Sequence, residues 1–141
     1  MNMVLDTGVT SLKEILLALL NYTDTFSFVI REDQHVSNEA MDLLEHLKVY
    51  LIETKKVSEW PGTNLLWGKV TLYLYYLNNE SAYILYTTEV NLYKWLLPDK
   101  PEDLTFYRND RPFFVSITHE KDAYFDVDND DRLFLESKKL I

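Results

Sequence analysis

The chain has 141 residues, of which 47% are hydrophobic and 14% aromatic, so it carries enough apolar side chains for one domain spanning residues 1–141. Its 14 basic and 23 acidic residues give a formal net charge of −9, which argues against general nucleic-acid binding and favours a basic protein partner. The absence of cysteine excludes disulfides and thiolate chemistry, and no apolar run is long enough to span a bilayer. We therefore expect a cytoplasmic protein without membrane contact and without a cofactor.

Three regular elements are predicted before residue 60. Apolar residues at helical spacing predict a helix over 11–22, and Ser11 has the spacing of a capping box at its start. Alternating residues predict a strand over 25–32. A second helical stripe follows Ser37, the expected N-cap, and continues to Leu51.

The middle of the chain contains one turn, one strand and one helix. The dipeptide Pro61-Gly62 is a strong turn signal. Residues 69–77 alternate and are rich in β-branched and aromatic residues, which is typical of a strand. Aromatic residues on its second face indicate that both faces are covered. A helix is predicted over 81–97, and Pro98 ends it because a residue before proline avoids the helical region.

The last third of the chain reads as a hairpin, a strand and a helix. Residues 104–118 are predicted to form a hairpin whose turn is Asn109-Asp110. Residues 123–127 add a strand. The segment from Asp128 onwards fits either a capped helix with acidic residues at its positive end or a further strand, and we favour the helix.

This order of elements predicts an α+β fold class, with a mainly antiparallel sheet packed against helices. In the hairpin, alternation places Phe113, Val115 and Ile117 on one face. It places Phe114 and Ser116 on the other.

Four polar residues beside two predicted strand ends are the first candidates for chemistry. A carboxylate pair such as Glu102 and Asp103 can divide acid and base roles, but neighbours on a strand point to opposite faces. His119 and Glu120 lack the second histidine of a zinc-protease motif, because Ala123 stands in its place. We therefore favour a structural role for these residues over a binding role, and a binding role over catalysis.

An acidic run near the C-terminus resembles the start of a calcium loop. Asp126, Asp128 and Asp130 have the spacing of its first ligands. Asp131 and Ser137, however, stand where the loop needs glycine and glutamate. The sequence also lacks a nucleophile elbow and a glycine-rich phosphate loop. We assign no catalytic residues and no metal site.

Three stretches carry a resemblance to a known family: "EWPGT", "LYKWLLPDKPEDLTFYR" and "FFVSITHEKDAYF". Together they resemble a family of small uncharacterised bacterial proteins with W-P-G-T and W-L-x-P-x-x-P-E-D-L-x-F…H-E motifs, sometimes labelled stage III sporulation proteins. The resemblance covers roughly residues 40–126 and implies a compact α+β protein without an established enzyme activity. It supplies no catalytic residues. The matching positions are Trp60, Pro61, Gly62, Trp95, Pro98, Pro101, Glu102, Asp103, His119 and Glu120.

Two hypotheses about function follow. The first is a small acidic binding protein, a regulatory or immunity-type partner of a basic protein. The alternative is a small enzyme or ligand-binding domain that uses the four polar residues Glu102, Asp103, His119 and Glu120. The candidate binding residues are Trp60, Glu102, Asp103, His119, Glu120, Tyr124, Asp126, Asp128 and Asp130. For the acidic segment a solvated turn with a helix cap remains an open interpretation, and Trp60 fits a buried turn as well as a pocket wall.

Overall fold

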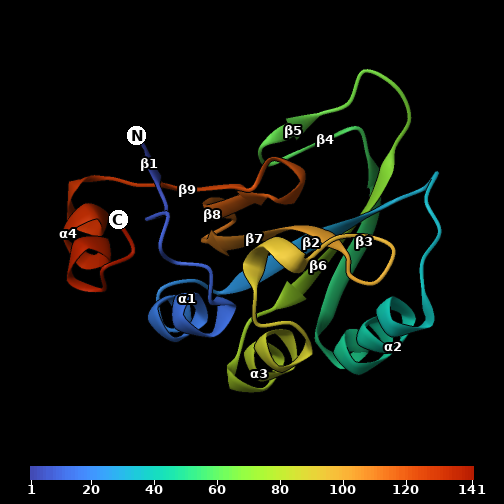
Figure 1. Ribbon diagram of the computed structural model, residues 1–141, viewed down its shortest axis with the longest axis horizontal. Coiled ribbons are helices and arrows are strands. Elements are labelled where there is room, and N and C mark those ends of the chain that lie inside the picture. The colour runs from blue at the N-terminus through green and yellow to red at the C-terminus, as the bar shows by residue number, and fades with distance from the viewer.

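A seven-stranded antiparallel sheet forms the centre of the computed structural model, which describes residues 1–141 (Figure 1). The strand order is β1-β9-β8-β7-β2-β6-β3, and β4 with β5 forms a separate hairpin. The strands are β1 (Asn2–Val4), β2 (Thr25–Arg31), β3 (Leu51–Val57), β4 (Glu59–Trp60), β5 (Thr63–Asn64), β6 (Val70–Tyr76), β7 (Glu102–Arg108), β8 (Arg111–Ile117) and β9 (Asp122–Asp126). The helices are α1 (Leu12–Leu19), α2 (Asn38–Leu47), α3 (Asn79–Thr88) and α4 (Asn129–Ser137), with short 3-10 turns η1 (Lys48–Tyr50), η2 (Leu92–Lys94) and η3 (Thr118–Glu120). The predicted α+β fold class is confirmed.

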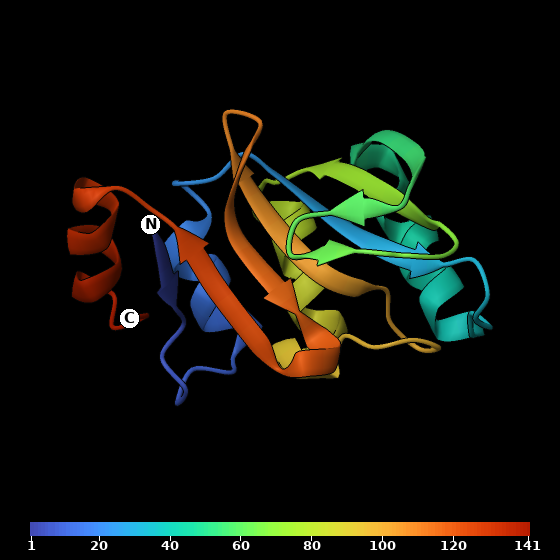
Figure 2. The ribbon, with the colours of Figure 1, turned by 90° about the horizontal axis from the view of Figure 1, so that it is seen from above.

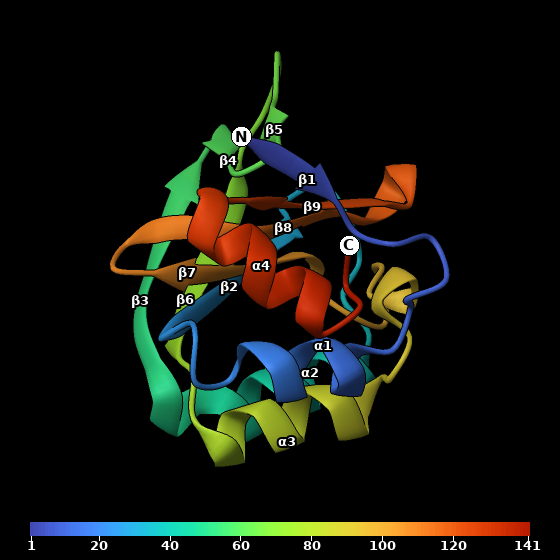
Figure 3. The ribbon, with the colours of Figure 1, turned by 90° about the vertical axis from the view of Figure 1, so that its left-hand side faces the viewer.

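The elements form layers on both sides of the sheet. Helices α1, α2 and α3 cover one face, and the β4–β5 hairpin lies over the other (Figures 1 and 2). Helix α4 lies at the end of the layers, between β9 and α1 (Figure 3). A core of 25 buried residues fills the space on the helix side. A smaller core, formed by Val29, Trp60, Val70 and Leu72, lies under the hairpin.

Local signals placed the starts of the first two helices and the central strands correctly. The Ser11 hydroxyl accepts a hydrogen bond from the Glu14 amide at 3.2 Å, and the Ser37 hydroxyl accepts one from the Ala40 amide at 3.3 Å. Strand β2 lies between β6 and β7, and its five inner residues are buried, which explains its nearly continuous apolar sequence.

The second helix is shorter than predicted. It ends at Leu47, and after one 3-10 turn Leu51 begins β3, which the sequence analysis missed. Pairing with β6 overrides the helical spacing here. Because β3 is an edge strand and residues 51–56 are all exposed, its sequence lacks the alternation that marks a half-buried strand.

The predicted helix over 81–97 is also too long. Helix α3 ends at Thr88, and Glu89 is extended with φ −152° and ψ 114°. The chain then pairs with the segment before α1: the Leu12 amide donates to the Val90 carbonyl, and the Leu92 amide donates to the Thr10 carbonyl. Two long-range backbone hydrogen bonds therefore end the helix before Pro98 can do so.

The predicted hairpin is present as β7 and β8. Its turn residues Asn109 and Asp110 have φ values of 52° and 65°, as a type I′ turn requires. The predicted faces are wrong at one residue. Phe106 pairs with Phe114 and the next residue of β7 pairs with Pro112, so Phe113 is an extra residue in a β-bulge. It therefore packs into the helix-side core together with Phe114.

The C-terminal strand and helix match the prediction. Strand β9 pairs with β8, and Asp128 caps α4 in a reciprocal capping box with Asp131. The sequence analysis did not predict β1, which pairs with β9 so that Asn2 lies opposite Asp126.

Candidate functional site

The predicted site residue Glu102 is wholly buried at the start of β7. Its carboxylate accepts hydrogen bonds from Arg31 Nε at 3.0 Å and from the Leu97 amide at 3.2 Å. His119 Nε2 lies 3.0 Å from Glu102 Oε2 and 3.1 Å from Oε1. Both carboxylate oxygens are therefore occupied by groups of the protein itself.

The neighbouring carboxylate of Asp103 points elsewhere. Asp103 lies in an irregularity of the β2–β7 pairing and has φ 60°. Its Oδ2 accepts a hydrogen bond from Trp60 Nε1 at 3.0 Å, and its Oδ1 accepts one from the Thr118 amide at 2.9 Å. The guanidinium of Arg31 lies over the Trp60 ring at 5.6 Å, which joins the surroundings of the two carboxylates. We call these side chains the β7 carboxylate network. Its hydrogen bonds hold the β4–β5 hairpin and η3 against the sheet.

The structure does not bring the four polar candidates together around a cavity. Glu102 and Asp103 are buried and fully hydrogen-bonded, while Glu120 is exposed and His119 is half exposed. Burial leaves Glu102 and Asp103 outside any surface that a rigid partner can touch, and Trp60 is only 4% exposed. No group of three or more histidine, aspartate or glutamate side chains is arranged to hold a metal ion.

A second carboxylate network lies at the start of α4. Arg108 binds the buried Asp131 with two hydrogen bonds of 2.8 and 2.9 Å, and the Tyr22 hydroxyl donates to Asp131 at 2.6 Å. Burial acts to raise the pKa of Asp131, but the hydrogen bonds from Arg108, Tyr22 and the Asp128 amide outweigh it and lower the pKa to about 2. The guanidinium also lies 4.7 Å from the centres of the Tyr22 and Phe113 rings. This network joins α4 to the β7–β8 hairpin.

The acidic segment predicted as a binding face is exposed in part. Asp126, Asp128 and Asp130 are exposed, Tyr124 is half-buried, and Phe125 lies in the core. The N-terminal amine lies 3.6 Å from Asp126 Oδ1. Two arginines line the same shallow cavity of about 310 Å³ as Asp126 and Asp128. Positive charge therefore offsets part of this acidic surface, and no fully exposed aromatic residue stands at its centre.

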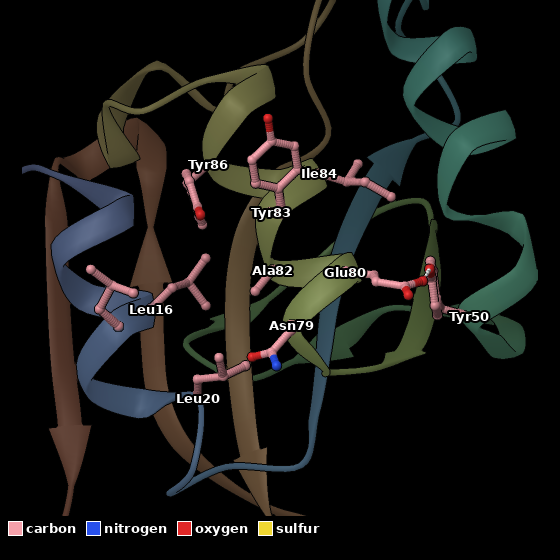
Figure 4. A pocket seen from close by; sticks show the side chains of 10 residues that line it. Leu16, Leu20, Tyr50, Asn79, Glu80, Ala82, Tyr83, Ile84 and Tyr86 are labelled. Carbon is pink, nitrogen blue, oxygen red and sulfur yellow. Dashed lines mark hydrogen bonds between the residues drawn. The ribbon is translucent and has the colours of Figure 1, made fainter.

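The largest apolar hollow is on the outer surface of the helix layer. This helix groove has a volume of about 610 Å³, and Figure 4 shows side chains of α1 and α3 and of Tyr50 around it. Its lining residues are Leu16, Leu17, Leu20, Tyr50, Asn79, Glu80, Ala82, Tyr83, Ile84 and Tyr86. Leu17 is 63% exposed and Tyr83 is 59% exposed, so both present apolar surface to solvent at this groove.

One hydrogen bond fixes an edge of the helix groove. The Tyr50 hydroxyl donates to Glu80 Oε2 at 2.5 Å, and this bond, followed by burial, raises the pKa of Tyr50. No motif in the sequence predicts this groove. Leu17 and Tyr83 lie outside the apolar stripes of their helices, and these two exposed residues were a signal in the sequence.

Acidic residues outnumber basic ones in the helix layer, and one of them, Glu80, lines the helix groove. The segments of α1, α2, η1 and α3 contain five acidic and two basic residues. The acidic residues are Glu14, Glu39, Asp42, Glu45 and Glu80, and the basic ones are Lys13 and Lys48. Only Glu39 among the acidic residues forms an ion pair, with Lys100 of the η2–β7 loop. The helix layer thus combines an apolar hollow with a negative surface.

Comparison with known proteins finds no matching family model, no similar curated protein and no similar solved structure. None of the helices has the length and apolar character needed to cross a membrane.

Proposed function

We propose that this protein acts by binding a basic protein partner rather than by catalysis, and that the helix groove is the contact surface. The observation that carries the proposal is the exposed Tyr83 at the middle of an apolar hollow of about 610 Å³. Tyrosine in a concave apolar setting is typical of residues that dominate the energy of protein–protein interfaces. Leu17 and Tyr50 supply further apolar area beside it.

The sign of the charge supports a basic partner. The whole chain has a formal charge of −9, and the helix layer is acidic as well. Negative charge around an interface speeds encounter with a positive surface and disfavours acidic competitors. Within this proposal the protein is a cytoplasmic regulatory or immunity-type partner.

The alternative, an enzyme or ligand-binding domain built on Glu102, Asp103, His119 and Glu120, has less support. A catalytic carboxylate needs a lone pair or a proton that substrate can reach. The carboxylate oxygens of Glu102 and Asp103 already accept hydrogen bonds within the β7 carboxylate network. The oligomeric state plays no part in the proposal.

The test is affinity capture from the native host, with quantitative mass spectrometry and then calorimetry on the recovered protein. The groove variant is Leu17→Ala with Tyr83→Ala. The matched control is Leu133→Ala with Tyr76→Ala, because these side chains are 67% and 58% exposed and lie away from the groove. We expect to recover a basic protein whose Kd rises at least about 30-fold with the groove variant, since two interface anchors of more than about 1 kcal/mol each together contribute more than about 2 kcal/mol. The control should bind like the wild type.

A third variant separates the helix groove from the acidic segment. It changes Asp126, Asp128 and Asp130 to lysine, and under the proposal it slows association only modestly. If this variant abolishes binding while the groove variant binds normally, the acidic segment is the contact surface and the groove proposal is wrong. Recovery of no basic protein by the wild type in low salt would contradict the proposed function as a whole.

A further inference from the structure

The face of the sheet opposite the helices carries a second groove that the proposed function does not use. This sheet groove has a volume of about 450 Å³ and runs between the β4–β5 hairpin and the turn of the β7–β8 hairpin. Figure 2 shows the β4–β5 hairpin lying across this face. Leu72 and Leu74 of β6 lie on its floor, and the W-P-G-T motif of the sequence supplies one wall.

That wall is held rigidly against the sheet. The Trp60 indole donates to the buried Asp103, and Arg31 covers one side of its ring. Gly62 has φ +87°, and a Cβ atom there would lie 2.9 Å from Ile117 Cγ1 and 3.0 Å from Val115 Cγ1. The hairpin therefore approaches β8 so closely that only glycine fits, and this close packing holds the wall against the sheet.

The opposite wall presents an aromatic ring that stays uncharged. The Tyr107 hydroxyl hydrogen-bonds with Ser27 at 2.8 Å, and burial raises the pKa of Tyr107. Pro112 lies beside this ring along the groove. The walls and floor are thus mostly apolar and aromatic surface, which accepts methylene groups and, at the ring faces, cations.

The rim of the sheet groove carries the charge. Glu53 of β3, Glu59 of β4 and Asp110 of the β7–β8 turn come from three different elements, and all three are exposed. Lys55 is the one basic residue of the lining, and its Nζ lies 3.9 Å from Glu53 Oε1. Glu59 and Asp110 form no ion pair. The groove therefore has a net negative rim above an apolar floor.

We propose that the sheet groove binds a short extended peptide segment with basic side chains. Arginine and lysine combine an apolar stem with a cationic end, so the stems cover Leu72 and Leu74 while the cations reach Glu59 and Asp110. Because Glu59 and Asp110 lie on separate elements, two basic side chains separated along the peptide can each pair with one of them. The Thr25 hydroxyl lines the groove without a protein hydrogen-bond partner and can donate to a peptide carbonyl, a group that a polyamine lacks.

This site is independent of the helix groove. The two grooves lie on opposite faces of the sheet and share no lining residue. An experiment can therefore refute the proposed binding at one groove without refuting it at the other. The test needs no natural partner. It uses acetyl-Arg-Ala-Arg-amide as the probe, with acetyl-Gln-Ala-Gln-amide and spermidine as comparisons, in a titration followed by backbone amide NMR at low salt.

We expect saturable shifts of β3, β6 and residues 107–112 with the arginine peptide and none with the glutamine peptide. Changing Glu59→Gln with Asp110→Asn should raise the Kd about tenfold, because two exposed carboxylates are lost. The control Asp42→Asn with Glu45→Gln removes the same charge from α2, on the opposite face, and should leave the Kd unchanged. Equal or tighter binding of spermidine at these residues would overturn the peptide assignment. Shifts confined to other elements, equal binding of the glutamine peptide, or no saturation would overturn the site.

Discussion

Replacing Asp131 by asparagine removes the charge at the centre of the network that joins α4 to the β7–β8 hairpin. The pKa of this carboxyl falls from 3.8 to about 2 on folding. Because the folded value lies below the unfolded one, the stabilisation is present in full well above pH 4 and is lost as the pH falls towards 2. The shift corresponds to about 2.5 kcal/mol at neutral pH and to about half of that at pH 3. The Asp131 side chain is only 4% exposed and that of Arg108 is 34% exposed, so solvent screens the ion pair only in part.

Urea unfolding, followed by tryptophan fluorescence and circular dichroism at pH 7, 5, 4 and 3, measures this contribution. We expect Asp131→Asn to lower the free energy of unfolding by about 2 to 3 kcal/mol at pH 7 and by about 1 kcal/mol at pH 3. Asp130→Asn is the matched control: this neighbour is exposed and unpaired, so its removal should cost less than about 0.5 kcal/mol. A difference between wild type and Asp131→Asn that is the same at pH 7 and pH 3 would refute the reasoning.

Three further predictions concern packing and metal dependence. Gly62→Ala should lower the free energy of unfolding by about 3 kcal/mol through backbone strain and overpacking. Gly68 has φ +78° but no atom within 4 Å of an added Cβ, so Gly68→Ala should cost only about 1 kcal/mol. Equal losses for the two variants in urea titrations would contradict the close approach of the hairpin to β8. Val115→Asp would bury an unpaired charge and should destabilise by about 3 kcal/mol or more, so a change below about 1 kcal/mol would show that Val115 is not in the core. Chelator should leave the Tm unchanged, and a fall of several degrees that zinc or calcium reverses would reveal a metal site.

Elements with local signals were predictable from the sequence. Ser11, Ser37 and Asp128 cap helices through bonds to residues three positions away, so a short window of sequence contains the whole interaction. Elements that depend on distant partners were not. Leu51 fits a helical stripe, and only pairing with β6 makes it the start of a strand. Glu89 ends α3 because of contacts near residue 10, which no pattern around it records.

The candidate sites also combine features that local sequence reveals with features that depend on distant contacts. The sequence singled out Glu102, Asp103 and His119 as unusual, and the structure joins them to Trp60 and Arg31 in one network around two buried carboxylates. The sequence could not reveal that these side chains bond to other groups of the protein. Those bonds depend on the irregular β2–β7 pairing and on the position of the β4–β5 hairpin. Both grooves arise where separate elements meet, so their linings are scattered along the chain and form no motif.

The pairing of β1 with β9 has a consequence for the synthesis of the chain. The N-terminal amine donates to the carbonyl of Val127, which is 126 positions away, and Asn2 lies opposite Asp126. At ribosomal rates of about 5–20 residues per second, Asn2–Val4 waits on the order of ten seconds for its partner strand to be made. The β7–β8 and β8–β9 pairings join strands close together in the chain, but β1 closes the largest loop in the fold, a step whose entropic cost slows folding. Strand β1 therefore stays unpaired while the strands between it and β9 are made, and this edge of the sheet is completed only after translation has passed β9.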